Sequence, residues 1–173
     1  MLRLLAPALA LTLLAQPLAA QEHEHATCEA GTVALPADLA GWNDRQPMNA
    51  GTRENRLETA ALVLGQAYDT TLSRTPDVRY IVRPEKPGGS VSYGGIFALD
   101  VTEAGTYRVA LGSAAWIDVV RGETVIQSGK FGHGPDCTGV RKMVEFALEP
   151  GRYVIQIAAN GQADLPLLVS RLN

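Results

Sequence analysis

Short runs of strand-forming residues recur at regular spacing between residues 66 and 170, and turn residues separate them. Within several runs apolar residues alternate with polar or charged ones, which is the pattern of a strand that buries one face. The expected strands, about nine in number, are residues 67–73, 78–83, 91–101, 106–111, 116–120, 124–127, 143–148, 152–158 and 165–170. The sequence therefore predicts an all-β, antiparallel sandwich of jelly-roll type with at most one short helix.

Two segments of this pattern are irregular. Apolar residues at 57, 60, 61 and 64 follow helical spacing, whereas the apolar run 62–64 stops at Gly65 as a strand would. Helix and strand therefore both remain open for residues 57–64. The expected strand 91–101 contains Gly94 and Gly95, which predicts a β-bulge or a close approach of another backbone there.

Residues 1–20 have the three-part plan of a secretory signal peptide. Arg3 gives a positive start, residues 4–14 are largely apolar, and Leu18-Ala19-Ala20 is typical of a cleavage site. The apolar run is too short to span a bilayer, and no later apolar stretch approaches 18 residues. We therefore expect an exported protein, periplasmic or extracellular, without a membrane anchor.

The remainder divides into a polar N-terminal segment and one domain. Residues 21–55 are expected to form a polar tail and a lead-in loop, with Trp42 packing on the domain and a loop-like stretch at 43–55. Residues 56–173 are expected to form the β-sandwich domain, and the chain is expected to be a monomer. The net charge of −3 argues against a nucleic-acid partner, since such binding needs a concentrated basic surface.

A short repeat supports the sandwich. Residues 103–109 (EAGTYRV) recur as residues 149–155 (EPGRYVI), each with a glycine turn followed by a tyrosine that opens a strand. Glycine suits the positive φ that such a turn often needs. Tyr107 and Tyr153 are each expected to bury the ring and direct the hydroxyl at backbone near the edge of the sandwich.

This turn-Gly-x-Tyr opening resembles the accessory β-sandwich modules of secreted bacterial proteins, including pre-peptidase C-terminal and carbohydrate-binding types. The resemblance covers the two turns and the strands that follow them. It implies a jelly-roll architecture and the role of a binding module, although many jelly rolls share the feature.

The two cysteines, Cys28 and Cys137, are a disulfide candidate because the chain is expected to be exported. Such a bridge would close a loop of about 110 residues, for which the entropy model gives roughly 4–5 kcal/mol. The alternative functions, a redox pair or metal thiolates, usually require closely spaced cysteines or neighbouring ligands.

The expected mature N-terminus begins at Gln21 and carries two histidines, His23 and His25. A histidine at the third mature position suits square-planar Cu(II) or Ni(II), so one of these metals could bind there. His23, His25 and Glu29 also have the His-x-His-x3-Glu spacing that resembles the first metal motif of cupins. That resemblance implies an iron site, but the second cupin motif is absent, although His133 exists.

The segment 129–139 is the one long glycine-rich loop that the sequence predicts. Its glycines allow tight folding, and charged side chains cluster in and just after it. These candidate ligand-binding residues are Lys130, His133, Asp136, Arg141 and Lys142. They fit a site for an anion or a polar ligand, with His133 as an acid or base. The alternative is a surface loop with solvated charges.

Trp116 and Asp118 share one face of the expected strand 116–120 and complete the set of candidate ligand-binding residues. If that face is exposed, the pair resembles a sugar-binding platform. If it is buried, Asp118 needs a partner, for which Arg108 or Arg141 is available. A core tryptophan is the simpler expectation.

Motifs of the common hydrolases and nucleotide-binding enzymes are absent from the sequence: Gly-x-Ser-x-Gly, His-Glu-x-x-His, Walker A and the Rossmann glycines. We therefore expect an exported, non-catalytic binding or structural protein with no cofactor, whose partner is a polysaccharide or an envelope protein. The alternative is a small metal-dependent enzyme of cupin-like oxygenase character, or a periplasmic copper- or nickel-binding protein. The enzyme requires His23 or His25 to lie within ligand reach of His133, whereas the copper- or nickel-binding protein would use the tail histidines.

Overall fold

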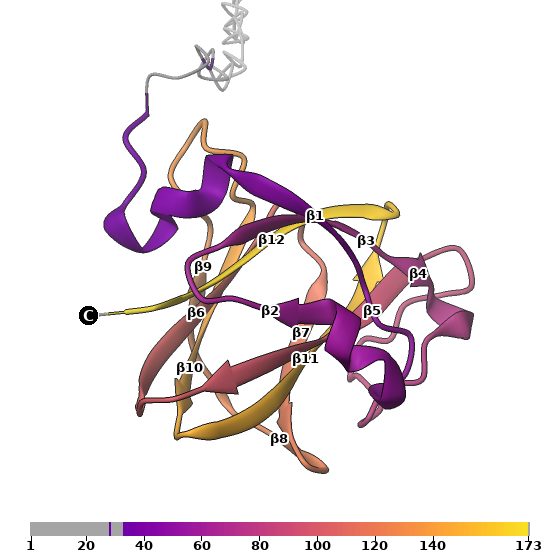
Figure 1. The fold of residues 1–173 in the computed structure, drawn as a ribbon. Helices are drawn as coiled ribbons and strands as arrows, with labels where there is room; N and C mark the ends of the chain where they lie inside the picture. The colour runs from indigo at the N-terminus through magenta and orange to yellow at the C-terminus, as the bar shows by residue number, and fades with distance from the viewer. Residues whose placement is uncertain (1–27, 29–32, 173) are drawn as a thin grey trace, which may run out of the picture.

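The computed structural model describes residue 28 and residues 33–172, and these residues form a sandwich of two six-stranded sheets (Figure 1). Sheet A has the order β1 (Arg45–Asn49), β3 (Ala67–Thr71), β12 (Asp164–Arg171), β6 (Gly105–Leu111), β10 (Lys142–Leu148) and β9 (Ser128–Gly132). Sheet B has the order β2 (Ala61–Leu62), β5 (Tyr93–Val101), β11 (Gly151–Asn160), β7 (Trp116–Arg121) and β8 (Thr124–Val125), and β4 (Ser73–Arg74) also pairs with β5. The predicted all-β sandwich is confirmed, with twelve strands in place of about nine.

Most neighbouring strands are antiparallel, and the exceptions lie at the edges. β1 runs parallel to β3, and β2 runs parallel to β5. Three short 3-10 helices complete the described residues: η1 (Ala37–Asn43), η2 (Glu54–Ala60) and η3 (Thr75–Asp77). Residues 57–64, for which helix and strand were both open, contain both, because η2 ends at Ala60 and β2 begins at Ala61.

The main core lies between the two sheets and consists of the residues that alternate inward along each strand. Phe97 of β5, Tyr107 of β6, Phe146 of β10 and Ile155 of β11 are among its fully buried side chains. Burying one such side chain contributes about 1.5–3 kcal/mol. The alternation that predicted the strands therefore also selects the core.

Each sheet also has a covered outer face. η1 packs on sheet A, where Leu39 and Trp42 are fully buried against Ala110 and Leu168. The indole N–H of Trp42 donates a 2.9 Å hydrogen bond to the carbonyl of Thr138, which confirms that Trp42 packs on the domain. η2 covers part of sheet B, with Leu57 and Ile96 in a third apolar cluster.

Residues 78–92, called the strap below, cross the outer face of sheet B. The sequence predicts a strand at 78–83, and this prediction is wrong. The amides of Ile81 and Val82 donate to Oε1 of the buried Gln156 at 2.6 and 3.2 Å, and Nε2 of Gln156 donates to the carbonyl of Val82 at 2.9 Å. A side chain therefore satisfies this backbone in place of a neighbouring strand.

Tyr80 fixes the same strap, because its hydroxyl donates a 3.0 Å hydrogen bond to the carbonyl of Ile157. Burial raises the pKa of Tyr80 to about 12, so the phenol stays protonated as a donor. A Cβ on Gly94 would lie 2.6 Å from that carbonyl oxygen, and one on Gly95 would lie 2.4 Å from the Cβ of Ala50. The close approach predicted at Gly94-Gly95 is confirmed.

Two further segments differ from the sequence-based expectation. The stretch 43–55 was expected to be a loop, but residues 45–49 form β1, so sheet A begins before residue 56. The loop expected at 129–139 begins with β9, which pairs with β10. Both strands lie at the edges of sheet A, and all five residues of β9 are exposed, so no buried face marks it in the sequence.

The two tyrosines of the repeat have matching positions. The hydroxyl of Tyr107 donates to the carbonyl of Glu103 at 2.7 Å, and that of Tyr153 donates to the carbonyl of Glu149 at 2.9 Å. Each ring is 2% exposed or less. The predicted burial and backbone contacts of both tyrosines are confirmed.

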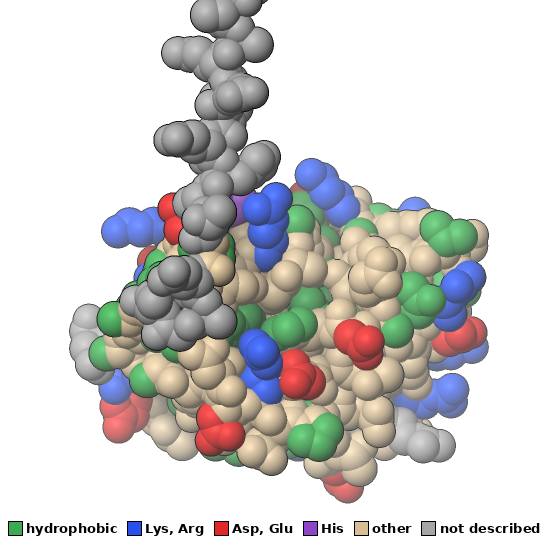
Figure 2. Space-filling view, turned by 90° about the horizontal axis from the view of Figure 1, so that it is seen from above, with side chains coloured by type: hydrophobic (Ala, Val, Ile, Leu, Met, Phe, Trp, Pro, Cys, Tyr) green, Lys and Arg blue, Asp and Glu red, His purple; other side chains and the backbone are tan. Residues whose placement is uncertain are grey.

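The predicted disulfide between Cys28 and Cys137 is present, with a Cα–Cα distance of 5.2 Å. It attaches residue 28 to the loop between β9 and β10, beside η1. In the part of the chain that the structure describes, none of the helices has the length and apolar character of a membrane span. Figure 2 shows positive and negative side chains interspersed on the face seen from above.

Candidate functional site

A cleft of about 540 Å³ lies where the edge strands of the two sheets meet. β8 ends sheet B, β9 ends sheet A, and the chain crosses from one to the other through Ile126 and Gln127. We call this hollow the Trp116 cleft. Its lining residues are Glu85, Lys86, Trp116, Ile117, Asp118, Val125, Ile126, Gln127, Ser128, Phe131, Lys142, Val144 and Phe146.

Trp116 and Asp118 lie on the outer face of β7, as their spacing predicts. The indole N–H of Trp116 donates a 2.9 Å hydrogen bond to Oδ1 of Asp118, which is 8% exposed. Burial raises the pKa of the Asp118 carboxyl, and the nearby negative charge of Glu85 raises it further. The expected arginine partner is therefore wrong, because the neighbouring indole takes that role.

Arg108 lies on the other sheet, where its guanidinium donates to the carboxylates of Asp38 and Glu145. Trp116 is half-buried and does not belong to the core, so the expected core tryptophan is Trp42 instead. Asp118 is thus hydrogen-bonded to a partly exposed aromatic ring at the cleft.

Two lysine side chains reach the ring of Trp116. The Nζ atoms of Lys86, on the strap, and Lys142, at the start of β10, lie 5.2 and 5.7 Å from the ring centroid. Nζ of Lys142 also donates a 2.7 Å hydrogen bond to the carbonyl of Ala115. Burial lowers the pKa of Lys142, and the charge of Lys86 lowers it further.

The rest of the cleft is largely apolar. Val144 and Phe146 of β10 and Ile117 of β7 are buried core residues that reach it from inside the sandwich. At the mouth, Phe131 of β9 is 82% exposed, the highest fraction among the exposed large apolar residues of the described chain. A hollow that combines apolar and aromatic side chains with a few charged groups is a common form of small-molecule site.

The other charged residues of the predicted loop do not line this cleft. His133 is exposed, and its Nδ1 lies 2.8 Å from the carbonyl oxygen of Arg141. Asp136 and Arg141 are also exposed, whereas Lys130 lines a separate small hollow beside Arg108. The structure therefore places Trp116, Asp118 and Lys142 together and distributes the remaining four candidates over the surface.

The candidate metal residues cannot be placed in the fold, because His23, His25 and Glu29 lie outside the described residues. Within residue 28 and residues 33–172, no group of three or more His, Cys, Asp or Glu side chains is arranged to hold a metal ion. A copper, nickel or iron site at the tail therefore stays a prediction.

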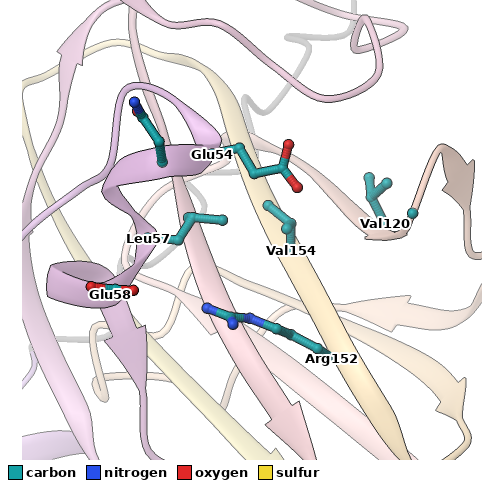
Figure 3. Close-up of a pocket in the computed structure, with 8 residues that line it drawn as sticks. Glu54, Leu57, Glu58, Val120, Arg152 and Val154 are labelled. Carbon is teal, nitrogen blue, oxygen red and sulfur yellow. The ribbon is translucent and has the colours of Figure 1, made fainter.

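A second hollow of about 300 Å³ lies on the outer side of sheet B (Figure 3). Figure 3 shows Arg152 extending from β11 toward η2, which carries Glu54, Leu57 and Glu58. No aromatic side chain lines this hollow. Because its described lining contains no aromatic ring, it is the weaker candidate site.

Sequence reasoning missed Phe131 and Lys86. Phe131 lies in the segment that was expected to be a loop, and Lys86 lies between the expected strands 78–83 and 91–101. One signal was available for Lys86, since the chain has only three lysines among 15 basic residues. The convergence of Phe131 and Lys86 on one cleft depends on tertiary contacts that no local pattern shows.

The structure defines a disulfide-linked β-sandwich with an aromatic, charged cleft at the edges of its sheets. No protein-family model matches the sequence, and no curated protein is significantly similar to it. The geometry of the cleft is therefore the basis for the functional proposal.

Proposed function

We propose that this chain is an exported, non-catalytic binding module that holds a polysaccharide chain in the Trp116 cleft. Export is supported by the signal-peptide plan of residues 1–20 and by the disulfide, a bond typical of oxidising compartments. The observation that carries the binding role is the position of Phe131, an exposed aromatic ring at the mouth of a cleft that also presents Trp116.

An exposed aromatic ring offers a flat apolar surface to the C–H face of a sugar, and burying it on a ligand stabilises the complex. Gln127 and Ser128 line the same cleft and supply hydrogen-bonding groups for sugar hydroxyls. The cleft lies at the side of the sandwich between two edge strands, so a long chain has room to pass across it.

Binding without catalysis is favoured because two of the four charged side chains of the cleft already hold hydrogen bonds within the fold. Asp118 accepts from the indole of Trp116, and Lys142 donates to a backbone carbonyl. The one histidine of the described residues, His133, does not line the cleft. Chain cleavage would require an acid and a base that converge on one bond.

The test uses protein secreted with its own leader and measures binding to a panel of soluble neutral and acidic polysaccharides by calorimetry. Phe131→Ala should lower the affinity for the bound polysaccharide about tenfold, the loss expected for one aromatic contact. Val63→Ala is the matched control, since Val63 is also an exposed apolar residue but lies beyond β2, outside the cleft.

Release of new reducing ends during the incubation would overturn the non-catalytic role. Failure to bind any member of the panel, or equal binding by F131A and the wild type, would overturn polysaccharide binding at this cleft.

A further inference from the structure

Two of the three lysines in the chain meet at one aromatic ring. Lys86 comes from the strap and Lys142 from β10, 56 positions apart in the sequence, yet both ammonium groups lie within 5.7 Å of the Trp116 ring centroid. Cation–π attraction explains why each remains near the ring. Because two ammonium groups lie near the Trp116 ring, a sugar that approaches the ring also meets positive charge.

In the part of the chain that the structure describes, neither ammonium group has a carboxylate partner. In every ion pair within 4 Å among the described residues the cation is an arginine, so none includes Lys86 or Lys142. The two carboxyl groups that line the cleft, Glu85 and Asp118, are therefore not paired with these lysines. Two like charges held close together without a counter-ion repel each other, and a bound anion would relieve the repulsion.

The remaining hydrogen-bonding capacity of the lysines suits an anion. Lys142 donates one of its three N–H groups to the carbonyl of Ala115, which fixes the ammonium group and leaves the other donors. Lys86 is exposed, and its flexible stem allows it to approach a ligand from the strap. Asp118 accepts the indole N–H of Trp116 through Oδ1 and forms no ion pair with either lysine in the described structure.

On the basis of the binding role proposed above, we propose that the Trp116 cleft selects a polysaccharide segment with an anionic group, such as a uronic acid carboxylate. Lys86 and Lys142 hold the anion beside the Trp116 ring, while Phe131 contacts the sugar ring that carries it. Lys86 and Lys142 are thus the residues that determine specificity for charge.

The experiment compares acidic and neutral polymers with the same backbone. The probes are polygalacturonate and its methyl ester, and carboxymethylcellulose and hydroxyethylcellulose, with polyglutamate as an acidic polymer that contains no sugar. Binding to the full secreted protein is measured by tryptophan fluorescence and calorimetry at low and high salt. Trp42 is fully buried, so loss of the fluorescence response in Trp116→Phe assigns it to the cleft.

The acidic member of a pair should bind at least about tenfold more tightly than its neutral counterpart, and the difference should shrink at high salt. Lys86→Gln and Lys142→Gln should each lower the ratio of acidic to neutral affinity about tenfold, the value of one charge-assisted hydrogen bond. Arg83→Gln is the matched control, because Arg83 is an exposed cation of the same strap that does not line the cleft. Lys86 is exposed, so K86Q tests the proposal even if K142Q fails to fold.

Equal binding of acidic and neutral members, or loss of preference in R83Q as large as in K86Q, would overturn charge selection and leave polysaccharide binding intact. A cleft response to polyglutamate alone would support anion selection and overturn the polysaccharide function. Absence of binding to every probe would overturn both.

Discussion

The indole N–H of Trp116 donates a 2.9 Å hydrogen bond to Oδ1 of Asp118, two residues further along the same strand. A carboxyl group that is 8% exposed normally needs a cation nearby, yet the described structure gives Asp118 an indole and no ion pair. Burial without a cation destabilises the charged form of Asp118, so the stability of the protein should depend on pH.

Because the folded pKa of Asp118 is raised, the folded state binds its proton more tightly than the unfolded chain does. The stability that this tighter proton binding contributes is fully present below the ordinary aspartate pKa of about 3.9. That stability is lost as the pH rises through the folded pKa of Asp118. Asp118→Asn is neutral and keeps an acceptor for Trp116. We expect D118N to gain stability relative to the wild type as the pH rises, by at most about 1.4 kcal/mol per pH unit.

Urea denaturation of both proteins from pH 3 to pH 8 measures this difference. A stability difference between D118N and the wild type that does not change with pH would contradict the raised pKa.

The two tyrosines of the repeat permit an internal comparison. Tyr107→Phe removes one hydrogen bond, that to the carbonyl of Glu103, and should cost about 0.5–1.5 kcal/mol. Tyr153→Phe removes two, since the hydroxyl of Tyr153 also accepts from the amide of Glu149 at 3.1 Å. It should therefore cost more, about 1–3 kcal/mol. Equilibrium denaturation tests the order, and a larger loss in Y107F than in Y153F would be inconsistent with these contacts.

The sequence predicts the core strands of this fold because burial leaves an alternating pattern. β6, β10 and β11 each alternate about an inward face, and their expected bounds differ from the observed ones by one or two residues. β9 leaves no such pattern because every residue in it is exposed, and β1 is obscured by Pro47 at the edge of its sheet. Edge strands depend on pairing with a distant neighbour.

The strap gives the opposite error. Val78 and Tyr80 are apolar at alternate positions because both pack on the outer face of sheet B, and this spacing resembles that of a strand.

Strand periodicity also predicted part of the candidate site. Trp116 and Asp118 share a face by strand geometry alone. The position of Lys86 beside the Trp116 ring depends instead on the hydrogen bonds by which Gln156 holds the strap. No pattern of neighbouring residues contains that information.

The disulfide should contribute more to stability than any single side-chain contact. Cys28 and Cys137 are 109 positions apart, and closing a loop of that length destabilises the unfolded chain by about 4–5 kcal/mol. We expect the double variant C28S/C137S to lose about that amount in urea denaturation. The control is the wild type in reducing agent, which should match the variant. An unchanged midpoint would show that the bridge does not constrain the unfolded state as the entropy model requires.

The ion pairs of Arg108 should contribute more to the free energy of unfolding than the exposed pair between Arg171 and Glu103. Arg108 is 18% exposed and donates to both Asp38 and Glu145, so Glu145→Ala leaves a largely buried cation with one partner fewer. We expect a loss of about 1–3 kcal/mol that depends weakly on salt. Glu103→Ala breaks the exposed pair with Arg171 and should cost less than about 1 kcal/mol. Denaturation at two salt concentrations compares them, and equal losses would contradict the role of burial.

Gln156 should control whether the strap stays on sheet B, because its fully buried amide makes three hydrogen bonds to residues 81 and 82. Gln156→Ala leaves these backbone groups without partners, so their amides should exchange with solvent about tenfold to a hundredfold faster. The amide of Arg79 is the internal control, since it donates to the carbonyl of Thr52 and does not depend on Gln156.

The same change should weaken binding of an acidic polymer at the Trp116 cleft, because the strap carries Lys86. Gln156→Glu keeps the oxygen that accepts from Ile81 and Val82 and should retain more of the protection than Q156A. Hydrogen exchange followed by mass spectrometry measures the strap, and calorimetry measures binding. If Q156A exposes the amides of residues 81 and 82 while affinity stays constant, Lys86 does not hold the ligand. If protection itself is unchanged, Gln156 does not fix the strap.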